Sequence, residues 1–250
     1  MRRRTRAIVA SLAVALIVGV AALAPALGAA AGGEEPRTVQ VTPLPLYFGI
    51  GISPKVLPVG AETPATLRLH VVDPPYEDGS GWAGFSTMTV DLDKSIHLNA
   101  GAFPTCGRRL LEADLDLEER VPSQCEKAIV GRSQAKLFIN PPEQNGLKDP
   151  ASGVIYNGGA RGGVTHLIVE LPFESPGESA WVTVLIGKGA TTRFPRFEEG
   201  FGALYEFSLE LNRKGFVTAE CTTGKITDSL AATFRDGTKA HEELIRACSR

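Results

Sequence analysis

The chain has 250 residues, with 26 basic and 28 acidic side chains and a net charge of −2 at pH 7. This balance excludes the broad basic surface with which proteins bind nucleic acids or anionic membranes. A chain of this length is expected to form one large β domain or two small ones, and it is long enough to bury a hydrophobic core.

The first residues have the three parts of a secretory signal peptide. Four arginines lie among the first six residues, an apolar stretch follows to about Leu27, and small residues end the segment. We expect cleavage after Ala29 or Ala31, although the apolar stretch is also long enough for a retained anchor. Cleavage would leave 22 basic and 28 acidic residues. We therefore assign 1–31 to the leader and 32–250 to one domain, secreted or associated with the cell envelope, with no later membrane span.

Four cysteines in an exported chain predict two disulfides. Three pairings are possible, and we favour the partners nearest in sequence, Cys106 with Cys125 and Cys221 with Cys248. Each would stabilise the fold by about 3 kcal/mol. The spacings of the cysteines and of the four histidines do not match those of metal ligands, so the sequence predicts no metal and no cofactor.

Alternating apolar and polar residues predict many short strands separated by glycine- and proline-rich loops. A lead-in at 39–52 contains two prolines, which favour an edge strand or extended chain. The strands then expected, in chain order, are 65–72, 86–92, 95–99, 128–139, 154–156, 164–171, 180–188, 204–211, 215–221, 230–235 and 239–247. The last could also be helical, but the preceding Asp236-Gly237 turn favours a returning strand.

A leucine-rich stretch between Cys106 and Cys125 predicts one or two short helices. The other elements are strands, and no repeat of fixed period occurs. The chain is therefore predicted to be all-β, an antiparallel β-sandwich of the immunoglobulin or jelly-roll type.

Several short motifs occur in a characteristic order. They are Ser53-Pro54-Lys55-Val56-Leu57-Pro58, Val90-Asp91-Leu92-Asp93, Phe103-Pro104-Thr105-Cys106, Tyr156-Asn157-Gly158-Gly159 and Phe234-Arg235-Asp236-Gly237. In these motifs the chain resembles a group of secreted actinobacterial proteins whose function is not established. The resemblance covers nearly the whole chain after the leader. It implies export, a β-rich fold and the two local disulfides, and it carries over no catalytic residue.

Candidate catalytic motifs are weak. Gly131-Arg132-Ser133-Gln134-Ala135 is close to a nucleophile elbow, but a strand-like segment follows where a helix is needed. Asp228 and His241 follow Ser133 in the required order, as such residues would in almost any chain. Paired carboxylates, Asp91 with Asp93 and Glu206 with Glu210, share strand faces that are usually solvated. The sequence favours a protein without catalysis, and the alternative is an exported hydrolase that uses Ser133 or a carboxylate pair.

Two further loop motifs match known patterns only in part. Gly79-Ser80-Gly81-Trp82-Ala83-Gly84 has the spacing of a dinucleotide-binding loop, but it follows a proline-rich loop and precedes a strand. Asp73, Glu77 and Asp78 supply carboxylates for calcium, but their spacing fits no standard calcium loop. Solvated loops are the better interpretation of both.

Exposed aromatic and polar loop residues indicate binding instead. Tyr76 and Trp82 share one glycine-rich loop, and exposed aromatic rings stack on sugars or on partner side chains. Asn157 and Arg161 lie in the glycine-rich turn 157–163. We therefore expect a non-catalytic binding module that uses these two loops, with a cell-wall glycan or another surface protein as partner.

Overall fold

Strands dominate the computed structural model, which describes residues 37–41, 44–76, 78–113, 123–140, 146–174, 179–197 and 200–248. All of them belong to one compact unit that spans Gly32–Arg250. The expected leader, 1–31, lies outside the described residues.

The described residues form fourteen strands, two short α-helices and one 3-10 turn. The strands are β1 (Arg37–Val41), β2 (Leu44–Ser53), β3 (Thr63–Val72), β4 (Phe85–Asp91), β5 (Ile96–Leu98), β6 (Ile129–Ile139), β7 (Leu147–Arg161), β8 (Val164–Pro172), β9 (Ser179–Ile186), β10 (Thr191–Arg193), β11 (Gly202–Leu211), β12 (Val217–Ala219), β13 (Lys225–Phe234) and β14 (Lys239–Ala247). The helical segments are η1 (Ala100–Ala102), α1 (Arg108–Ala113) and α2 (Ser123–Glu126). None of the described helices has the length and apolar character needed to cross a membrane.

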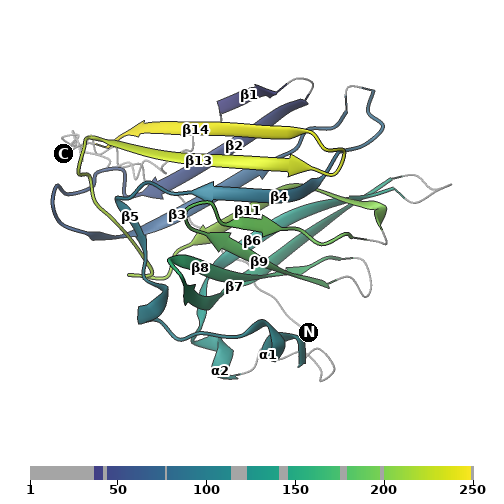
Figure 1. Ribbon diagram of the computed structural model, residues 1–250. Coiled ribbons are helices and arrows are strands. Elements are labelled where there is room, and N and C mark those ends of the chain that lie inside the picture. Colours follow the sequence, from purple (N-terminus) through teal and green to yellow (C-terminus); the bar gives the residue numbers. More distant parts are fainter. Residues whose placement is uncertain are drawn as a thin grey trace, which may run out of the picture. The chain divides into compact units, whose positions relative to one another are not determined.

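All fourteen strands belong to one sheet, in the order β1-β2-β3-β11-β6-β7-β8-β9-β4-β13-β14 (Figure 1). Three short strands lie off this path: β10 pairs with β4, and β12 joins β3 to β5. Neighbouring strands along the path are antiparallel except β4 and β9, which run parallel at Val90 and Ile186. The sheet is therefore mixed at one point, where β9 turns into β10.

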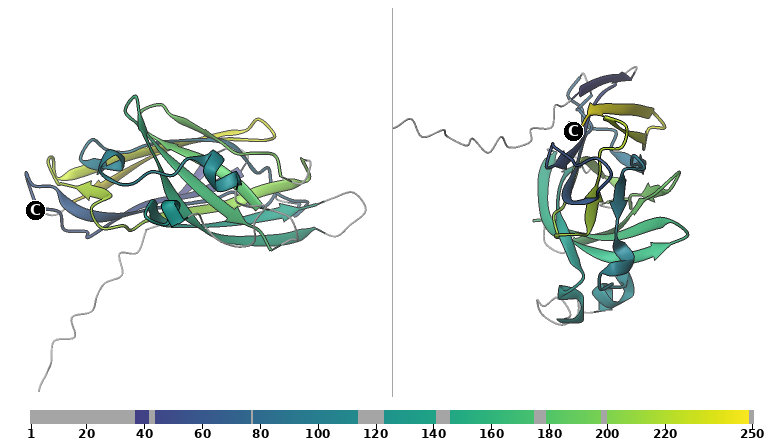
Figure 2. Two further views of the ribbon diagram at one scale, coloured as in Figure 1. Left: turned by 90° about the horizontal axis from the view of Figure 1, so that it is seen from below. Right: turned by 90° about the vertical axis from the view of Figure 1, so that its left-hand side faces the viewer.

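The sheet folds back on itself, so that β4, β13 and β14 face β2, β3 and β11 across the core (Figures 1 and 2). Period-two alternation buries one face of each strand, as in β3, where Leu67, Leu69 and Val71 are all buried. Aromatic contacts join the two layers, with 5.5 Å between the ring centroids of Phe194 and Phe207.

This architecture confirms the predicted fold class, including the short helices between the first two cysteines. Both predicted disulfides are also confirmed, with Cα–Cα distances of 5.2 Å for Cys106–Cys125 and 5.9 Å for Cys221–Cys248. The first joins the two ends of the helical segment, which packs against β7, β8 and β9. A second, smaller core forms there around Leu111, Tyr156 and Trp181.

The element boundaries differ clearly from the sequence prediction in four places. Strand β7 continues through Asn157 to Arg161, which were predicted to lie in the turn 157–163, because these residues pair with β8. Strand β7 begins at Leu147, inside a stretch predicted as a loop, because β6 pairs with it as far as Ile139. Strand β13 begins at Lys225, five residues earlier than expected, because it follows β14 as far as Ala247. The short strand β10 was not predicted. In each case pairing with a neighbouring strand overrides a weak local pattern.

Candidate functional site

The outer face of β3, β11 and β6 carries a polar groove of about 450 Å³. These strands turn their apolar side chains inward, and Leu69, Phe207 and Leu209 are buried. The side chains between them point outward and line what we call the sheet-face groove. Its outward side chains are Arg68, His70, Arg132, Gln134, Glu206, Ser208, Glu210 and Asn212.

The strand register sets these side chains in rows that run across the sheet. In the middle row Ser208 of β11 lies opposite His70 of β3 on one side and Gln134 of β6 on the other. Gly49 of β2 and Ser152 of β7 extend this row at its two ends. Small residues alternate with hydrogen-bonding side chains, so this row forms the floor of the groove.

Longer charged side chains form the two walls, each about 7 Å from the floor row because the rows are two residues apart. One wall is Arg68, Glu210 and Arg132, in which Arg68 Nε lies 2.7 Å from Glu210 Oε2. The other wall contains Glu206, whose carboxylate lies 2.7 Å from Lys136 Nζ and 3.4 Å from His70 Nε2.

These ion pairs shift two pKa values in the directions expected from charge pairing. The hydrogen bond from Arg68 lowers the pKa of Glu210, and Asn212 and Arg132 lower it further, against a partial loss of solvation. The hydrogen bond to Glu206 raises the pKa of Lys136. Glu210 and Lys136 therefore stay ionised at neutral pH. The side chains of the walls are still partly exposed, with 43% of the Arg68 and 50% of the Lys136 side chain accessible, so a ligand can reach them.

Ser208, His70 and Glu206 share this face, which is the residue set of a hydrolase triad. However, β11 is paired along both edges, so its backbone N–H groups are engaged in the sheet. The backbone of β11 therefore offers no free N–H donor beside Ser208 for a developing oxyanion, and such a donor would have to be a side chain such as that of Gln134.

The predicted nucleophile, Ser133, lies on the opposite face of β6. Its side chain is buried, and its hydroxyl donates a hydrogen bond to the carbonyl of Glu170 at 3.0 Å. The surrounding motif is the interior of a long strand, without the strand-to-helix turn that exposes a nucleophile. Asp228 is buried on β13, and His241 is exposed on β14. The Ser133 hydroxyl donates to the Glu170 carbonyl, Asp228 accepts from Arg246, and His241 is exposed, so the described contacts do not join these three residues as a triad.

A second groove, of about 670 Å³, lies where β4 and β9 end side by side. We call it the end groove. Its aliphatic lining is Leu92, Ile96, Leu98 and Ile186, and its polar lining includes Asp91, Asp93, Lys94, His97, Asn99, Thr165 and Lys188.

The predicted carboxylate pairs both lie in these grooves but are already engaged. Asp93 accepts hydrogen bonds from the Ser95 hydroxyl and backbone and from Thr227 N, and Asp91 accepts one from Gly189 N. Glu206 and Glu210 are ion-paired in the sheet-face groove. Hydrolysis of a glycoside needs one carboxylic acid with a raised pKa, whereas hydrogen bonds from Ser95 and Thr227 lower the pKa of Asp93 and Arg68 lowers that of Glu210.

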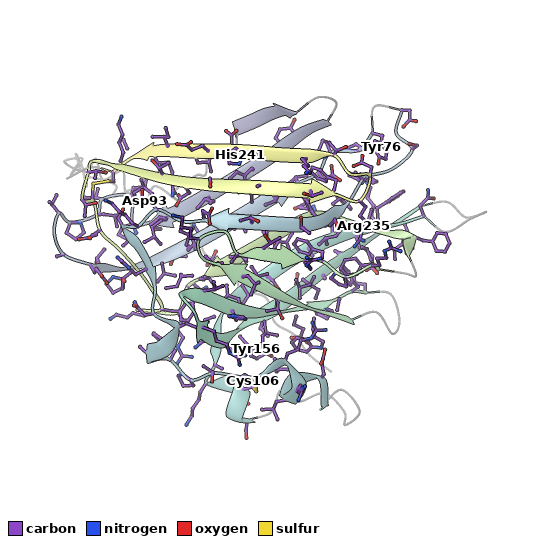
Figure 3. All side chains as sticks on the ribbon, viewed as in Figure 1. Tyr76, Asp93, Cys106, Tyr156, Arg235 and His241 are labelled. Atoms are coloured by element: carbon purple, nitrogen blue, oxygen red, sulfur yellow. A yellow bond between two sulfur atoms is a disulfide. The ribbon has the colours of Figure 1, made fainter. Side chains whose placement is uncertain are left out.

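The loop predicted to bind through Tyr76 and Trp82 lies at one end of the fold, near Arg235 (Figure 3). The Trp82 ring stacks on Tyr205 with 4.5 Å between centroids, and it also contacts Phe138 at 4.5 Å. The ammonium of Lys148 lies 5.2 Å from the Trp82 centroid. Trp82 therefore packs against the protein, and Tyr76 and Trp82 do not form the open platform that sequence alone suggests.

The glycine-rich turn separates its two predicted residues. Asn157 is fully buried, and its side-chain amide donates to the carbonyls of Ala100 and Pro104 at 2.9 and 3.0 Å. Its role is to hold the segment before Cys106 against β7. Arg161 is exposed, next to Gly162 and Gly163, whose positive φ values of 58° and 79° form the tight turn. Of the two, only Arg161 is available to a ligand.

The loop that precedes β4 carries the calcium-like carboxylates and the glycine motif of the sequence analysis. Among the described residues, no group of three or more histidine, cysteine or acidic side chains is arranged to hold a metal ion, and Glu77 lies outside them. The Asp78 carboxylate instead accepts a hydrogen bond from Ser80 N at 2.9 Å. The glycine motif runs into β4 rather than into a helix, so it lacks the helical N–H groups that hold a pyrophosphate.

Comparisons with protein-family models, with curated proteins and with solved structures found no match to this chain. The groove residues that the sequence analysis missed, above all Arg132, Gln134, Ser208 and Asn212, carry a single signal in the sequence. They occupy the polar positions of alternating strands, which identifies an outer face but does not show which strands lie side by side.

Proposed function

We propose that the protein is exported and acts outside the cytoplasm as a non-catalytic module that binds an extended, polar glycan. The observation that carries the proposal is the floor row of the sheet-face groove. His70, Ser208 and Gln134 offer donors and acceptors at regular intervals across three adjacent strands. A linear chain of sugars presents hydroxyl groups at regular intervals and matches such a row.

The composition of the groove favours a glycan over a protein partner. Protein interfaces bury an apolar core that is rich in aromatic residues, and the outward side chains of this groove are polar. An aromatic ring does stand at the margin: Tyr47 of β2 lies opposite Val72, in the same row as Glu206, and is 41% exposed. A sugar at the end of the groove can stack on this ring.

Export is the second part of the proposal. It is supported by the leader-like composition of residues 1–31 and by two disulfides, which persist in oxidising compartments.

The test is capture of the mature protein, purified from culture medium, on immobilised β-1,4-glucan, β-1,3-glucan, chitin and peptidoglycan. Ser208→Ile fills the middle of the floor with a residue that favours strands, so the fold should persist while binding is blocked. We expect at least one polymer to capture the wild-type protein. The affinity of Ser208→Ile for that polymer should be about tenfold weaker, because the variant loses roughly one hydrogen bond and its larger side chain blocks the floor of the groove.

Arg161→Ala is the matched control, because it removes an exposed polar side chain from the glycine-rich turn predicted to bind. Its capture should equal that of the wild type. If Arg161→Ala loses capture and Ser208→Ile retains it, the turn is the site and the groove proposal is wrong.

A further inference from the structure

The sheet-face groove contains one more cation than its carboxylates neutralise. Besides His70, its walls hold Arg68, Arg132 and Lys136 against two carboxylates, those of Glu206 and Glu210. Lys136 pairs with Glu206 and Arg68 with Glu210. Arg132 forms no ion pair with another described residue, and it lies exposed at the rim in a chain whose net charge is negative.

Glu210 lies between the two arginines in the register but does not hold both. Its Oε2 accepts the hydrogen bond from Arg68 Nε at 2.7 Å, and its Oε1 accepts one from Asn212 Nδ2 at 3.1 Å. Neither oxygen accepts a hydrogen bond from Arg132, although the positive charge of Arg132 also lowers the pKa of Glu210. The register holds the Arg132 guanidinium beside this carboxylate, and no hydrogen bond joins it to another described residue, so its N–H donors can bind a ligand.

We propose that Arg132 binds a carboxylate of the ligand, so that the groove selects a glycan carrying uronate groups over its neutral counterpart. This inference rests on the proposed glycan-binding function and names the chemistry that decides its specificity. A planar guanidinium donates two parallel hydrogen bonds to a carboxylate, a geometry that an ammonium cannot offer. Gln134, two residues further along the same face of β6, lies within reach of a hydroxyl on the same sugar.

The salt dependence follows from the same charges. Because Arg132 is exposed, its attraction for a ligand carboxylate is screened by added salt, whereas hydrogen bonds to neutral sugar hydroxyls are not. The preference for the charged glycan should therefore shrink as the sodium chloride concentration rises, while the affinity for the neutral glycan stays constant.

The experiment uses two probes with the same backbone, a β-1,4-glucan hexasaccharide and the same hexasaccharide with its C6 hydroxymethyl groups oxidised to carboxylates. Calorimetry compares the full-length mature protein with Arg132→Gln and with Arg193→Gln, which removes an exposed arginine from β10 outside the groove. We expect the wild type and Arg193→Gln to bind the oxidised probe about tenfold more tightly than the neutral probe, which is roughly one charge-assisted hydrogen-bond pair. Arg132→Gln should bind both probes equally.

The contrary outcomes separate the inference from the proposed function. Equal wild-type affinity for the two probes, or a preference retained by Arg132→Gln, overturns the role of Arg132 and leaves glycan binding in place. If the wild type binds neither of the two probes and none of the polymers in the capture panel, both proposals are wrong. If it binds a polymer but neither probe, the role of Arg132 in selecting an oxidised glucan is wrong and glycan binding stands.

Discussion

Two fully buried carboxylates, Asp228 and Asp73, lie at opposite ends of the sheet and meet very different neighbours. Asp228 accepts hydrogen bonds from the Arg246 guanidinium and from Asp93 N, the latter at 2.9 Å. Asp73 accepts one hydrogen bond, from Gly84 N at 2.8 Å, and its Oδ1 has no hydrogen-bond partner among the described residues. Figure 3 shows the two surroundings through Asp93 at one end and Arg235 at the other.

The pKa values follow from this difference. Burial raises the pKa of both groups, because the charged form loses its hydration. At Asp228 the charge of Arg246 opposes that rise. At Asp73 no cation of the described part of the chain opposes the rise: the Gly84 hydrogen bond lowers the pKa, the charge of Asp236 raises it, and the result is about 7. A buried carboxylate with a cation is one half of an ion pair, and one without a cation keeps its proton almost to neutrality.

Arg246 also links the last strand of the sheet, β14, to β2 near the opposite edge. Its Nη1 donates to the carbonyl of Ile50 at 2.8 Å, so the same side chain links β14 to β2 and neutralises Asp228. The ion pair is therefore a closing contact between the two layers, whereas Asp73 fixes only the loop that precedes β4.

The largest effect should come from removing the cation. Arg246→Met leaves Asp228 buried and unpaired, which costs about 3–5 kcal/mol of unfolding free energy. Urea unfolding at pH 7.5 measures it. The double variant Arg246→Met with Asp228→Leu replaces the buried ion pair by two apolar side chains, so it should recover much of the lost unfolding free energy. A single variant within about 1 kcal/mol of the wild type would show that the pair does not close the sheet.

The next effect is the pH dependence caused by Asp73, whose folded pKa lies above its unfolded value. Below about pH 4 the carboxyl is protonated in both states. Between about pH 4 and pH 7 only the unfolded state has released the proton, so stability falls as pH rises, by on the order of 4 kcal/mol in total. Above pH 7 this contribution becomes constant.

Asp73→Asn tests this sign directly, because an amide keeps the acceptor for Gly84 N and cannot ionise. Urea unfolding from pH 4.5 to pH 8 should show a much flatter curve for the variant, which should be the more stable protein at pH 8. Identical slopes for the two proteins would mean that another group dominates and that Asp73 ionises normally.

The same comparison shows what the sequence could predict. Period-two patterns such as Leu67, Leu69 and Val71 place the strands, and cysteines close in sequence predict the disulfides, since both depend on local order. The groove depends on partners such as Arg68 and Glu210, which are 142 residues apart, and no local pattern encodes that pairing. Strand order therefore had to come from the structure.

Asp73 illustrates the same limit at a single residue. In the sequence it opens a loop of Pro, Asp and Gly residues, where a solvated charge is the ordinary expectation. It is buried because its backbone N–H bonds Tyr205 O at 2.7 Å and its side chain turns inward to Gly84 N. The turn after β13 then brings Asp236 close. Each of these contacts joins segments whose adjacency appears only after folding.

The smallest predicted effect tests the second carboxylate at this end. Asp236→Asn removes the negative charge that raises the pKa of Asp73, while the amide oxygen can still accept from Thr238 N. The midpoint of the stability profile should move to lower pH by roughly half a unit, the size of a charge interaction near a protein surface. Carbon-13 NMR of the Asp73 carboxyl measures the shift.

Tyr76→Phe is the control, because the Tyr76 hydroxyl contacts Asp236 only at 3.5 Å and its loss leaves both carboxylates in place. A midpoint that moves as far in Tyr76→Phe as in Asp236→Asn would assign the effect to loop packing instead of charge.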